Sequence, residues 1–239
     1  RDYRPGDPLR SIEWKATARM QRLVVRKMTE EQHLEIVIAV DVGRTSRRAA
    51  GTLTELGHQV NLAARLAEFA VDNDDRVGLV VFAGEARQTL PPQSGVAAVT
   101  RIRAILRELE PQTEESNPLA AVMHIRKLVR HRSLVVLPAD LEDSDGTGQL
   151  VQSTRLLRPT HLPLLVSLID PQVEELAQRP ARSWLDPYVS LAAINSQRHI
   201  STNQARLRQL GATVVRARPL ELDHAVLATY AGLRRRHRI

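Results

Sequence analysis

Short apolar runs alternate along the chain with longer stretches in which apolar residues recur every three or four positions. Five runs rich in valine, leucine and isoleucine predict buried strands, at 35–42, 76–83, 133–137, 162–169 and 212–217. A shorter strand is predicted at 86–90 as an edge hairpin partner, because two prolines close it. The helical spacing between the runs predicts helices that begin near residues 53, 102, 118, 150, 171 and 220.

Strands that alternate with helices are typical of a parallel sheet whose two faces are both covered. We therefore expect residues 34–239 to form an α/β domain with a six-stranded, mostly parallel sheet and helices on both faces. Gly146-Thr147-Gly148 interrupts this pattern and is interpreted as a turn, since the third glycine of a dinucleotide-binding loop is missing.

Residues 1–33 differ in character, because they are rich in charge and poor in apolar side chains. We interpret this stretch as an N-terminal arm outside the core. Asp7 as a cap and Pro8 as the first helical residue predict a helix. Its apolar face would carry Leu9, Ile12, Ala16 and Met20.

Composition excludes several kinds of chemistry. The chain has no cysteine, which rules out disulfides, thiolate zinc sites and a cysteine nucleophile. No lysine follows a glycine, so a P-loop for nucleotide phosphates is absent, and so is a Gly-x-Ser-x-Gly nucleophile elbow. The longest apolar stretches, near 77–83 and 162–169, are too short for a membrane span, which needs roughly 20 residues.

The chain is basic, with a net charge of +7, three lysines and 31 arginines. A basic surface suggests nucleic acid or anionic lipid as a partner. However, the arginines are scattered, and the seven aromatic residues offer few platforms on which bases could stack. Nucleic-acid binding is therefore kept as an alternative function, whose mark would be a steep loss of affinity with salt.

Acidic residues follow two of the predicted strands. The first strand runs into Asp41, followed by Gly43, Arg44 and Thr45, and the strand at 133–137 runs towards Asp140. In an open α/β sheet the ligand crevice lies beyond the carboxyl ends of the strands. Two carboxylates with hydroxyls between them would suit Mg²⁺, which prefers oxygen ligands. The alternative interpretation is that both aspartates only cap helices.

Several of these segments resemble known sequences. The first strand with its Asp-x-x-x-Thr loop, the run RVGLVVFAG and the run SLVVLPADLED are similar to a von Willebrand factor A-like domain. The opening RDYRPGD and the following RSIEWKATAR resemble the signature of domain-of-unknown-function family 58. This similarity covers nearly all of the chain and implies a Rossmann-like, von Willebrand A-like fold.

The resemblance implies a metal-ion-dependent adhesion site, with Asp41 as the first acid, Thr45 as the second hydroxyl and Asp140 as the last acid. The distant threonine position falls on Asn117 or Ser116, or on Thr113 if the loop is longer. Gly43 replaces the first serine, so the site is degenerate. We expect Arg44 to pair with Asp140 or Asp41 and Mg²⁺ to bind weakly or not at all.

The resemblance also implies a function. It points to a non-enzymatic adaptor or assembly module that acts with a MoxR-type AAA+ ATPase and an unidentified client protein. The location implied is the cytoplasmic face of the bacterial inner membrane, with the membrane reached through a segment absent from this chain. A metal-dependent hydrolase that uses Asp41 and Asp140 is the least favoured alternative, because no general base is identifiable.

Interaction residues are expected in the arm as well as at the crevice. The charged and aromatic side chains of the arm form either a ladder of ion pairs that fastens it to the domain or a protein interface, in which Arg and Trp commonly dominate. The residues expected to take part in interactions are Arg44, Tyr3, Asp7, Arg10, Trp14 and Arg19.

Overall fold

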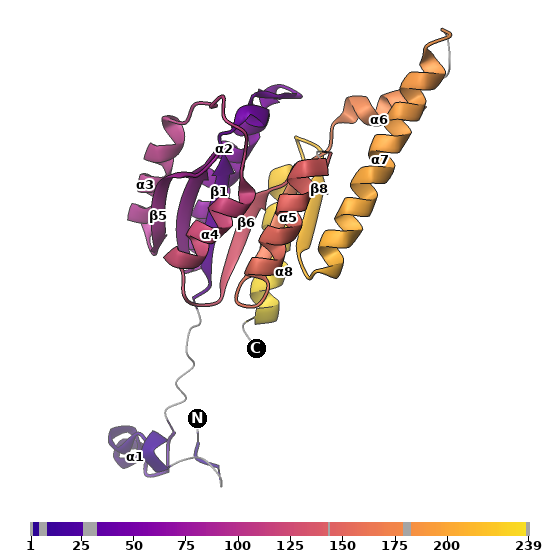
Figure 1. Cartoon of the computed structure of the whole chain (residues 1–239). Coiled ribbons are helices and arrows are strands. Elements are labelled where there is room, and N and C mark those ends of the chain that lie inside the picture. The colour runs from indigo at the N-terminus through magenta and orange to yellow at the C-terminus, as the bar shows by residue number, and fades with distance from the viewer. Residues whose placement is uncertain (1, 5–8, 26–32, 143, 179–182, 238–239) are drawn as a thin grey trace. The chain divides into compact units, whose positions relative to one another are not determined.

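The computed structural model describes residues 2–4, 9–25, 33–142, 144–178 and 183–237. Two compact units are present, residues 1–32 and residues 33–239. The larger unit contains a twisted sheet with helices on both of its faces (Figure 1). Within the described ranges, every helix falls short of the combination of length and apolarity that crossing a bilayer requires.

The central sheet has six strands in the order β5-β4-β1-β6-β7-β8. All neighbouring pairs are parallel except β4 and β5, which form the predicted antiparallel hairpin at one edge. The predicted six-stranded, mostly parallel sheet is therefore confirmed. The strands are β1 (Glu35–Asp41), β4 (Arg76–Phe82), β5 (Ala86–Gln93), β6 (Ser133–Pro138), β7 (Leu162–Leu168) and β8 (Thr213–Ala217).

Two apolar layers hold the helices to the sheet. Successive residues of β1 point to opposite faces, so Ile36 and Ile38 belong to one layer and Val37 and Ala39 to the other. The first layer packs under α2 (Glu55–Asp72), α3 (Val96–Arg107) and α8 (Leu222–His237). The second packs under α4 (Pro118–Leu128), α5 (Ser144–Leu157) and α7 (Asp186–Gln209).

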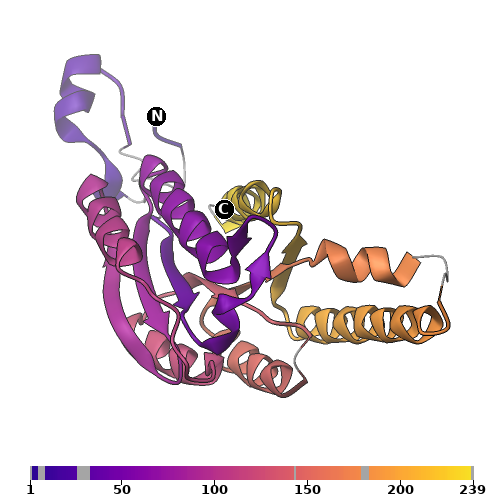
Figure 2. The same cartoon turned by 90° about the horizontal axis from the view of Figure 1, so that it is seen from above.

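Helix α7 is much longer than the sheet it covers. Its 24 residues span about 36 Å. Ile200 and Leu207, in its C-terminal half, are buried in the core. The N-terminal half projects away from the sheet together with α6 (Pro171–Gln178), which packs along it (Figures 1 and 2).

Helix α5 corrects one prediction. It begins at Ser144 and includes Gly146-Thr147-Gly148, where the sequence predicted a turn. The Nδ2 atom of buried Asn203 on α7 donates to the Thr147 hydroxyl at 3.2 Å and to the Leu141 carbonyl at 3.0 Å. This tertiary contact favours the helix over the turn, although glycine disfavours a helix by about 1 kcal/mol per residue.

The C-terminal helix is tied to the sheet by one buried carboxylate. Asp75 accepts hydrogen bonds from the Leu34 backbone N–H at 2.9 Å, from the Arg234 Nε at 2.8 Å and from the Tyr230 hydroxyl. Both Asp75 and Tyr230 are fully buried. Arg234, the first of three consecutive arginines near the C-terminus, is therefore a structural residue.

The smaller unit contains a short 3₁₀ helix, η1 (Leu9–Ser11), and α1 (Trp14–Met20). The predicted helix start at Pro8 lies outside the described residues, and the regular α-helix begins only at Trp14. Ile12 pairs with Val25 in a β-bridge instead of joining the helix, and both side chains are buried. This bridge is a non-local contact that local spacing did not reveal.

Of the arm residues expected to take part in interactions, Asp7 and the side chain of Arg10 lie outside the described residues. The Tyr3 backbone N–H donates to the Leu23 carbonyl at 2.9 Å. Trp14 and Arg19 lie on α1, and Trp14 is 66% exposed. The exposed Trp14 ring is thus available for contacts, and its role as an interaction residue stays a prediction.

Candidate functional site

A cavity of about 280 Å³ lies at the carboxyl ends of β1, β6 and β7. The sheet order reverses between β1 and β6, so the loops that follow these two strands diverge and leave a crevice. Asp41 and Asp140 both line this cavity, which confirms the expectation that the two strand ends come together. Its deeper wall is apolar and includes Ile38, Val136 and Val166.

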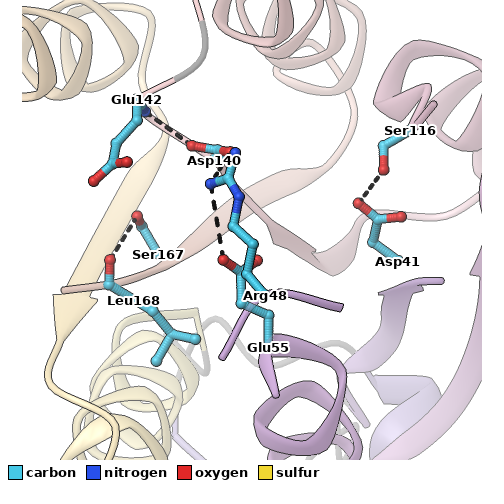
Figure 3. Close-up of polar contacts among 8 residues, drawn as sticks. All are labelled: Asp41, Arg48, Glu55, Ser116, Asp140, Glu142, Ser167 and Leu168. Carbon is cyan, nitrogen blue, oxygen red and sulfur yellow. Dashed lines mark hydrogen bonds and ion pairs between the residues drawn. The ribbon is translucent and has the colours of Figure 1, made fainter. Parts of the chain in front are cut away.

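Asp41 ends β1 and is almost completely buried. Its Oδ1 accepts from the Gly43 backbone N–H at 2.7 Å, and its Oδ2 accepts from the Ser116 hydroxyl at 2.6 Å (Figure 3). Burial raises the pKa of Asp41; the Ser116 and Gly43 hydrogen bonds oppose the rise, and the nearby charge of Asp140 adds to it. Both carboxylate oxygens are thus committed to donors of the chain itself.

Gly43 is required by the position of Ser116. A Cβ atom at residue 43 would lie 2.3 Å from the Ser116 Oγ and 3.0 Å from the Asp41 Oδ1. The backbone of Gly43 has φ −67°, which other residues adopt readily, so close approach rather than backbone conformation selects glycine here. The Ser116 hydroxyl fills the space that a serine side chain at position 43 would need.

Of the two positions expected for the distant ligand, Ser116 contacts Asp41 and Asn117 does not. Asn117 caps α4, since its Oδ1 accepts from the Ala120 backbone N–H at 3.0 Å. Capping commits the Asn117 side chain to the helix, whereas the preceding residue, Ser116, reaches Asp41. Thr45 lines the cavity as expected.

Two arginines, Arg48 and Arg216, line the cavity, and Arg48 contacts two of its acids. The Arg48 Nη1 lies 3.0 Å from the Asp140 Oδ2 and 3.9 Å from the Glu55 Oε1. Asp140 Oδ1 also accepts from the Glu142 backbone N–H at 2.9 Å (Figure 3). Arg48 therefore joins the end of β6 to the first turn of α2.

The predicted pairing of Arg44 with Asp41 or Asp140 is wrong. Arg44 and Arg47 lie three residues apart on the 3₁₀ helix η2 (Arg44–Arg47), whose three-residue turn puts them on the same side. Arg44 Nε donates to the exposed Glu115 carboxylate at 2.9 Å, and Arg47 donates to the Pro111 carbonyl at 3.0 Å. Arg48 follows the turn and reaches Asp140 instead.

Glu55 is the most perturbed acid in the cavity. Burial raises its pKa to about 7, with the charges of Asp140, Asp41 and Glu142 adding to the rise and Arg48 opposing it. The pKa of Glu142 is also raised, first by burial and then by Asp140. The cavity therefore holds more carboxylates than its two arginines, Arg48 and Arg216, can neutralise, and the pKa of Glu55 lies near neutral pH.

Mg²⁺ prefers about six oxygen ligands and keeps several waters, and part of the donor set at the strand ends is already engaged within the chain. Gly43 offers no side-chain oxygen, both Asp41 oxygens accept hydrogen bonds, and Asp140 is paired with Arg48. In the part of the chain that the structure describes, no three or more acidic or histidine side chains are arranged to hold a metal ion. Weak or absent Mg²⁺ binding stays a prediction.

Local sequence patterns did not identify Arg48, Glu55 or Gln59 as site residues. Gln59 Oε1 accepts from the Asp41 backbone N–H at 2.8 Å, and Glu55 lies one turn earlier on α2. The helix that follows a parallel strand starts at the same edge as the strand's end. The first turns of α2 are therefore the place in the sequence where Glu55 and Gln59 could have been recognised as site residues.

The sheet order and the cleft at the strand ends define a von Willebrand factor A-like fold. The chain belongs to the family described as "Protein of unknown function DUF58", whose model matches residues 1–218. The match includes the N-terminal unit as well as most of the sheet domain.

A curated relative is the uncharacterised protein Rv1480 of Mycobacterium tuberculosis, 25% identical over 176 residues that make up 73% of this chain and 55% of the relative. The chain thus spans about half the length of the curated relatives it matches.

Two solved structures share the fold. BatB, a conserved hypothetical protein from Bacteroides thetaiotaomicron, has a TM-score of 0.52 and 16% identity, over 82% of this chain and 99% of BatB. The PilB minor pilin from Streptococcus sanguinis has a TM-score of 0.52 and 11% identity, over 87% of this chain and 62% of PilB. At these identities the likeness shows the fold alone.

Proposed function

We propose that this chain is a non-catalytic docking module that binds a MoxR-type AAA+ ATPase, and through it a client protein, at the rim of the strand-end cavity. The observation that carries the proposal is the Arg48 guanidinium, which lies 3.0 Å from Asp140 and 3.9 Å from Glu55, so that a cation of the chain itself engages one strand-end acid. Membership of a family with a von Willebrand A-like fold supports an interaction module in general.

The state of the two strand-end aspartates favours docking over hydrolysis. A metal-dependent hydrolase would use Asp41 and Asp140 to hold its metal ion. Here Asp41 accepts from Ser116 and Gly43, and Asp140 accepts from Arg48 and the Glu142 backbone. Because both aspartates already have hydrogen-bond partners within the chain, their side chains are held in place, which suits a recognition surface.

The charge of the rim indicates what the partner presents. Asp41, Glu55, Asp140 and Glu142 act on one another electrostatically, and Arg48 and Arg216 offset only part of their charge. A partner loop that carries lysine or arginine would complement this excess and speed its encounter with the chain. We propose that this docking takes place at the cytoplasmic face of the bacterial inner membrane, with the membrane contact made outside residues 1–239.

The proposal is tested by immobilising the chain and measuring how much of a purified MoxR-type ATPase from the same organism it captures. Asp140→Asn and Glu142→Gln are each expected to weaken capture by about tenfold or more, because each removes negative charge that a basic partner loop would meet. Glu114→Gln is the matched control, since Glu114 is exposed, pairs with Arg87 and does not line the cavity. Circular dichroism verifies that each variant is folded.

Capture that survives Asp140→Asn and Glu142→Gln unchanged would contradict the docking surface. Equal losses in Glu114→Gln and Asp140→Asn would also contradict it, because a general electrostatic effect does not distinguish acids inside the cavity from acids outside it.

A further inference from the structure

Three stretches of the chain contain no acidic residue. They are residues 116–139, 146–169 and 187–220, and together they carry ten arginines and one lysine. Each stretch spans most of one helix and the strand that follows it, namely α4 with β6, α5 with β7 and α7 with β8. The acidic residues that separate the stretches lie in the segments that follow β6 and β7. The turns from these helices into their strands are therefore basic.

Topology brings the three helix-to-strand turns to one edge of the sheet. The strands β6, β7 and β8 are parallel neighbours, so they begin at the same edge, opposite the strand-end cavity. Helices α4 and α5 end at this edge, as Figure 1 shows, and α7 ends where β8 begins. The exposed cations at the three helix ends and their turns are here called the basic edge: Arg126, Lys127, Arg130, Arg132, Arg155, Arg158, Arg206 and Arg208.

The three helix ends are close enough to form one surface. Burial lowers the pKa of His161, in the turn after α5, and the charge of Arg126 on α4 lowers it further. Arg158, at the end of α5, packs against Gly211 in the turn before β8 and leaves no room there for a Cβ atom. Arginines that are scattered along the sequence are thus gathered in the folded domain.

The cations of the basic edge lack the acidic partners that other arginines of the sheet domain have. Arg44, Arg87 and Arg103 each pair with a glutamate. Among the residues that the structure describes, no carboxylate oxygen lies within 4 Å of any cation of the basic edge. Like charges gathered without partners oppose folding, so this arrangement indicates an anionic ligand outside the chain.

Stabilisation of helix ends does not account for the whole basic edge. Cations in the last turn of a helix complement its dipole, as Arg126 and Lys127 do on α4. However, Arg130 and Arg132 lie beyond that turn, where the dipole effect fades. Helix α2 ends at the same edge of the sheet with Asp72 and has no basic residue in its last turn. The fold therefore does not require cations at this edge.

The form of the basic edge favours an anionic lipid surface over a nucleic acid. Proteins hold nucleic-acid phosphates with backbone N–H groups and helix N-termini as well as with side chains. The basic edge presents helix C-termini, whose partial charge is negative. Residues 126–132, 155–161 and 206–214 also contain no phenylalanine, tyrosine or tryptophan on which a base could stack. A bilayer attracts cations through its surface potential, without fitted contacts.

The two edges of the sheet differ in charge, which would orient the domain on such a surface. Four acids line the cavity at the carboxyl ends of the strands, namely Asp41, Glu55, Asp140 and Glu142. An anionic surface attracts the basic edge and repels this acidic one.

We propose that the basic edge binds the surface of a bilayer that contains anionic phospholipid, and that the strand-end cavity consequently faces away from the membrane. This contact lies within residues 33–239 and is additional to the membrane contact proposed above. It rests on the proposed location at a membrane, but not on the partner that docks at the cavity.

Co-sedimentation of the chain of residues 1–239 with vesicles made of equal parts phosphatidylglycerol and phosphatidylcholine tests the proposal. Binding is expected at low salt and is expected to be lost near about 1 M salt, where the Debye length falls to about 3 Å. Lys127→Glu and Arg130→Glu are each expected to weaken binding by about tenfold or more. One basic residue near the membrane contributes about fivefold, and each replacement also adds a repelled charge. Vesicles of phosphatidylcholine alone are expected not to bind.

Arg107→Glu is the matched control for Lys127→Glu. Both residues are exposed cations in the last turn of a helix. Helix α3 leads to the opposite edge of the sheet, where the Gln112 backbone N–H donates to the Val42 carbonyl at 2.6 Å. Arg107→Glu is therefore expected to change vesicle binding by less than about threefold. Lys15→Glu is the corresponding control for the N-terminal unit, and circular dichroism verifies that each variant is folded.

Three results would overturn the proposal. The first is no co-sedimentation of the wild-type chain at low salt, and the second is binding that Lys127→Glu and Arg130→Glu leave unchanged. The third is an equal loss in Lys127→Glu, Arg107→Glu and Lys15→Glu, because net charge alone would then explain binding.

Duplex DNA tests the competing ligand. Binding to duplex DNA that is tighter than binding to the vesicles at the same salt concentration would assign the basic edge to nucleic acid and overturn the proposal. Asp140→Asn distinguishes this proposal from docking at the cavity. It is expected to weaken capture of the ATPase and to leave vesicle binding unchanged, because Asp140 lies at the opposite edge. Either proposal can therefore fail without the other.

Discussion

The strand-end cavity and the exposed start of α7 differ in charge and in whether their side chains already have partners within the chain. In the cavity, Asp41 and Asp140 accept hydrogen bonds from Ser116, Gly43 and Arg48. At the start of α7, Trp184 and Tyr188 are exposed to solvent on either side of Asp186 in the sequence.

This difference separates two ways of presenting a surface. The cavity is a polar site built on the apolar core, so its geometry depends on the stability of the whole domain. The start of α7 extends beyond the core, so its side chains contribute little to folding and are available for association. Variants in the two regions are therefore expected to change different measurements.

The largest expected effect is on unfolding by urea. Ile38→Ala removes a buried side chain beneath the cavity and is expected to lower the free energy of unfolding by about 2–5 kcal/mol. Leu191→Ala, at the exposed start of α7, is expected to change it by less than about 0.5 kcal/mol in the monomer. Comparable losses in the two variants would contradict the distinction between the regions.

The next effect is a dependence of stability on pH. The pKa of Glu55 is raised from its ordinary value of 4.5 to about 7 in the folded state, so folding favours the protonated form. The contribution of Glu55 to the free energy of unfolding is complete below pH 4.5 and is lost as the pH rises through 7.

Glu55→Gln is therefore expected to stabilise the protein by about 2–3 kcal/mol at pH 8 and to have little effect at pH 4.5. Urea unfolding at both pH values measures this difference. Glu115→Gln is the control, because Glu115 is exposed and pairs with Arg44. A pH-independent effect of Glu55→Gln would show that the carboxyl does not titrate in this range.

A smaller effect is expected where Gly43 meets Ser116. Gly43→Ala places a methyl group against the Ser116 hydroxyl and is expected to lower the free energy of unfolding by about 1–3 kcal/mol. Adding Ser116→Ala removes the contacting atom, so the double variant is expected to be less destabilised than the sum of the two single variants. Additive costs would show that the close contact is not the reason for glycine at this position.

The smallest effect is expected from the two arginines. Arg48→Met leaves Asp140 and Glu55 without their cation and is expected to cost about 1 kcal/mol, a value limited by solvent screening because Arg48 is half exposed. Arg44→Met is expected to change the urea midpoint within error, since its pair with Glu115 is exposed. A larger loss of unfolding free energy from Arg44→Met than from Arg48→Met would contradict the conclusion that Arg48, and not Arg44, pairs with the acids of the cavity.

Much of the fold was predictable because its strands and helices have strong periodicity. The strand predicted at 35–42 is found at 35–41, and the edge strand predicted at 86–90 continues to Gln93 through the two prolines that were expected to close it. The helix through Gly146 and Gly148 was not predicted, because a contact between Thr147 and Asn203, far apart in sequence, outweighs the local preference. The bridge between Ile12 and Val25 is non-local in the same sense.

The site was predictable where topology alone decides it. The parallel strands bring Asp41 and Asp140 to one edge whatever the loops do. The choice between Arg44 and Arg48 depended on the direction of a single 3₁₀ turn, and the choice between Asn117 and Ser116 depended on where α4 begins. Spacing in the sequence does not determine either choice.

We expect the pair between Asp140 and Arg48, together with the hydrogen bonds from Ser116 and Gly43 to Asp41, to take the place of a metal ion at the strand ends. Calorimetric titration of the purified wild-type chain with MgCl₂ tests this expectation most directly. The account predicts no saturable heat beyond dilution at any Mg²⁺ concentration in the micromolar range. Stoichiometric micromolar binding that disappears in Asp41→Ala would contradict it.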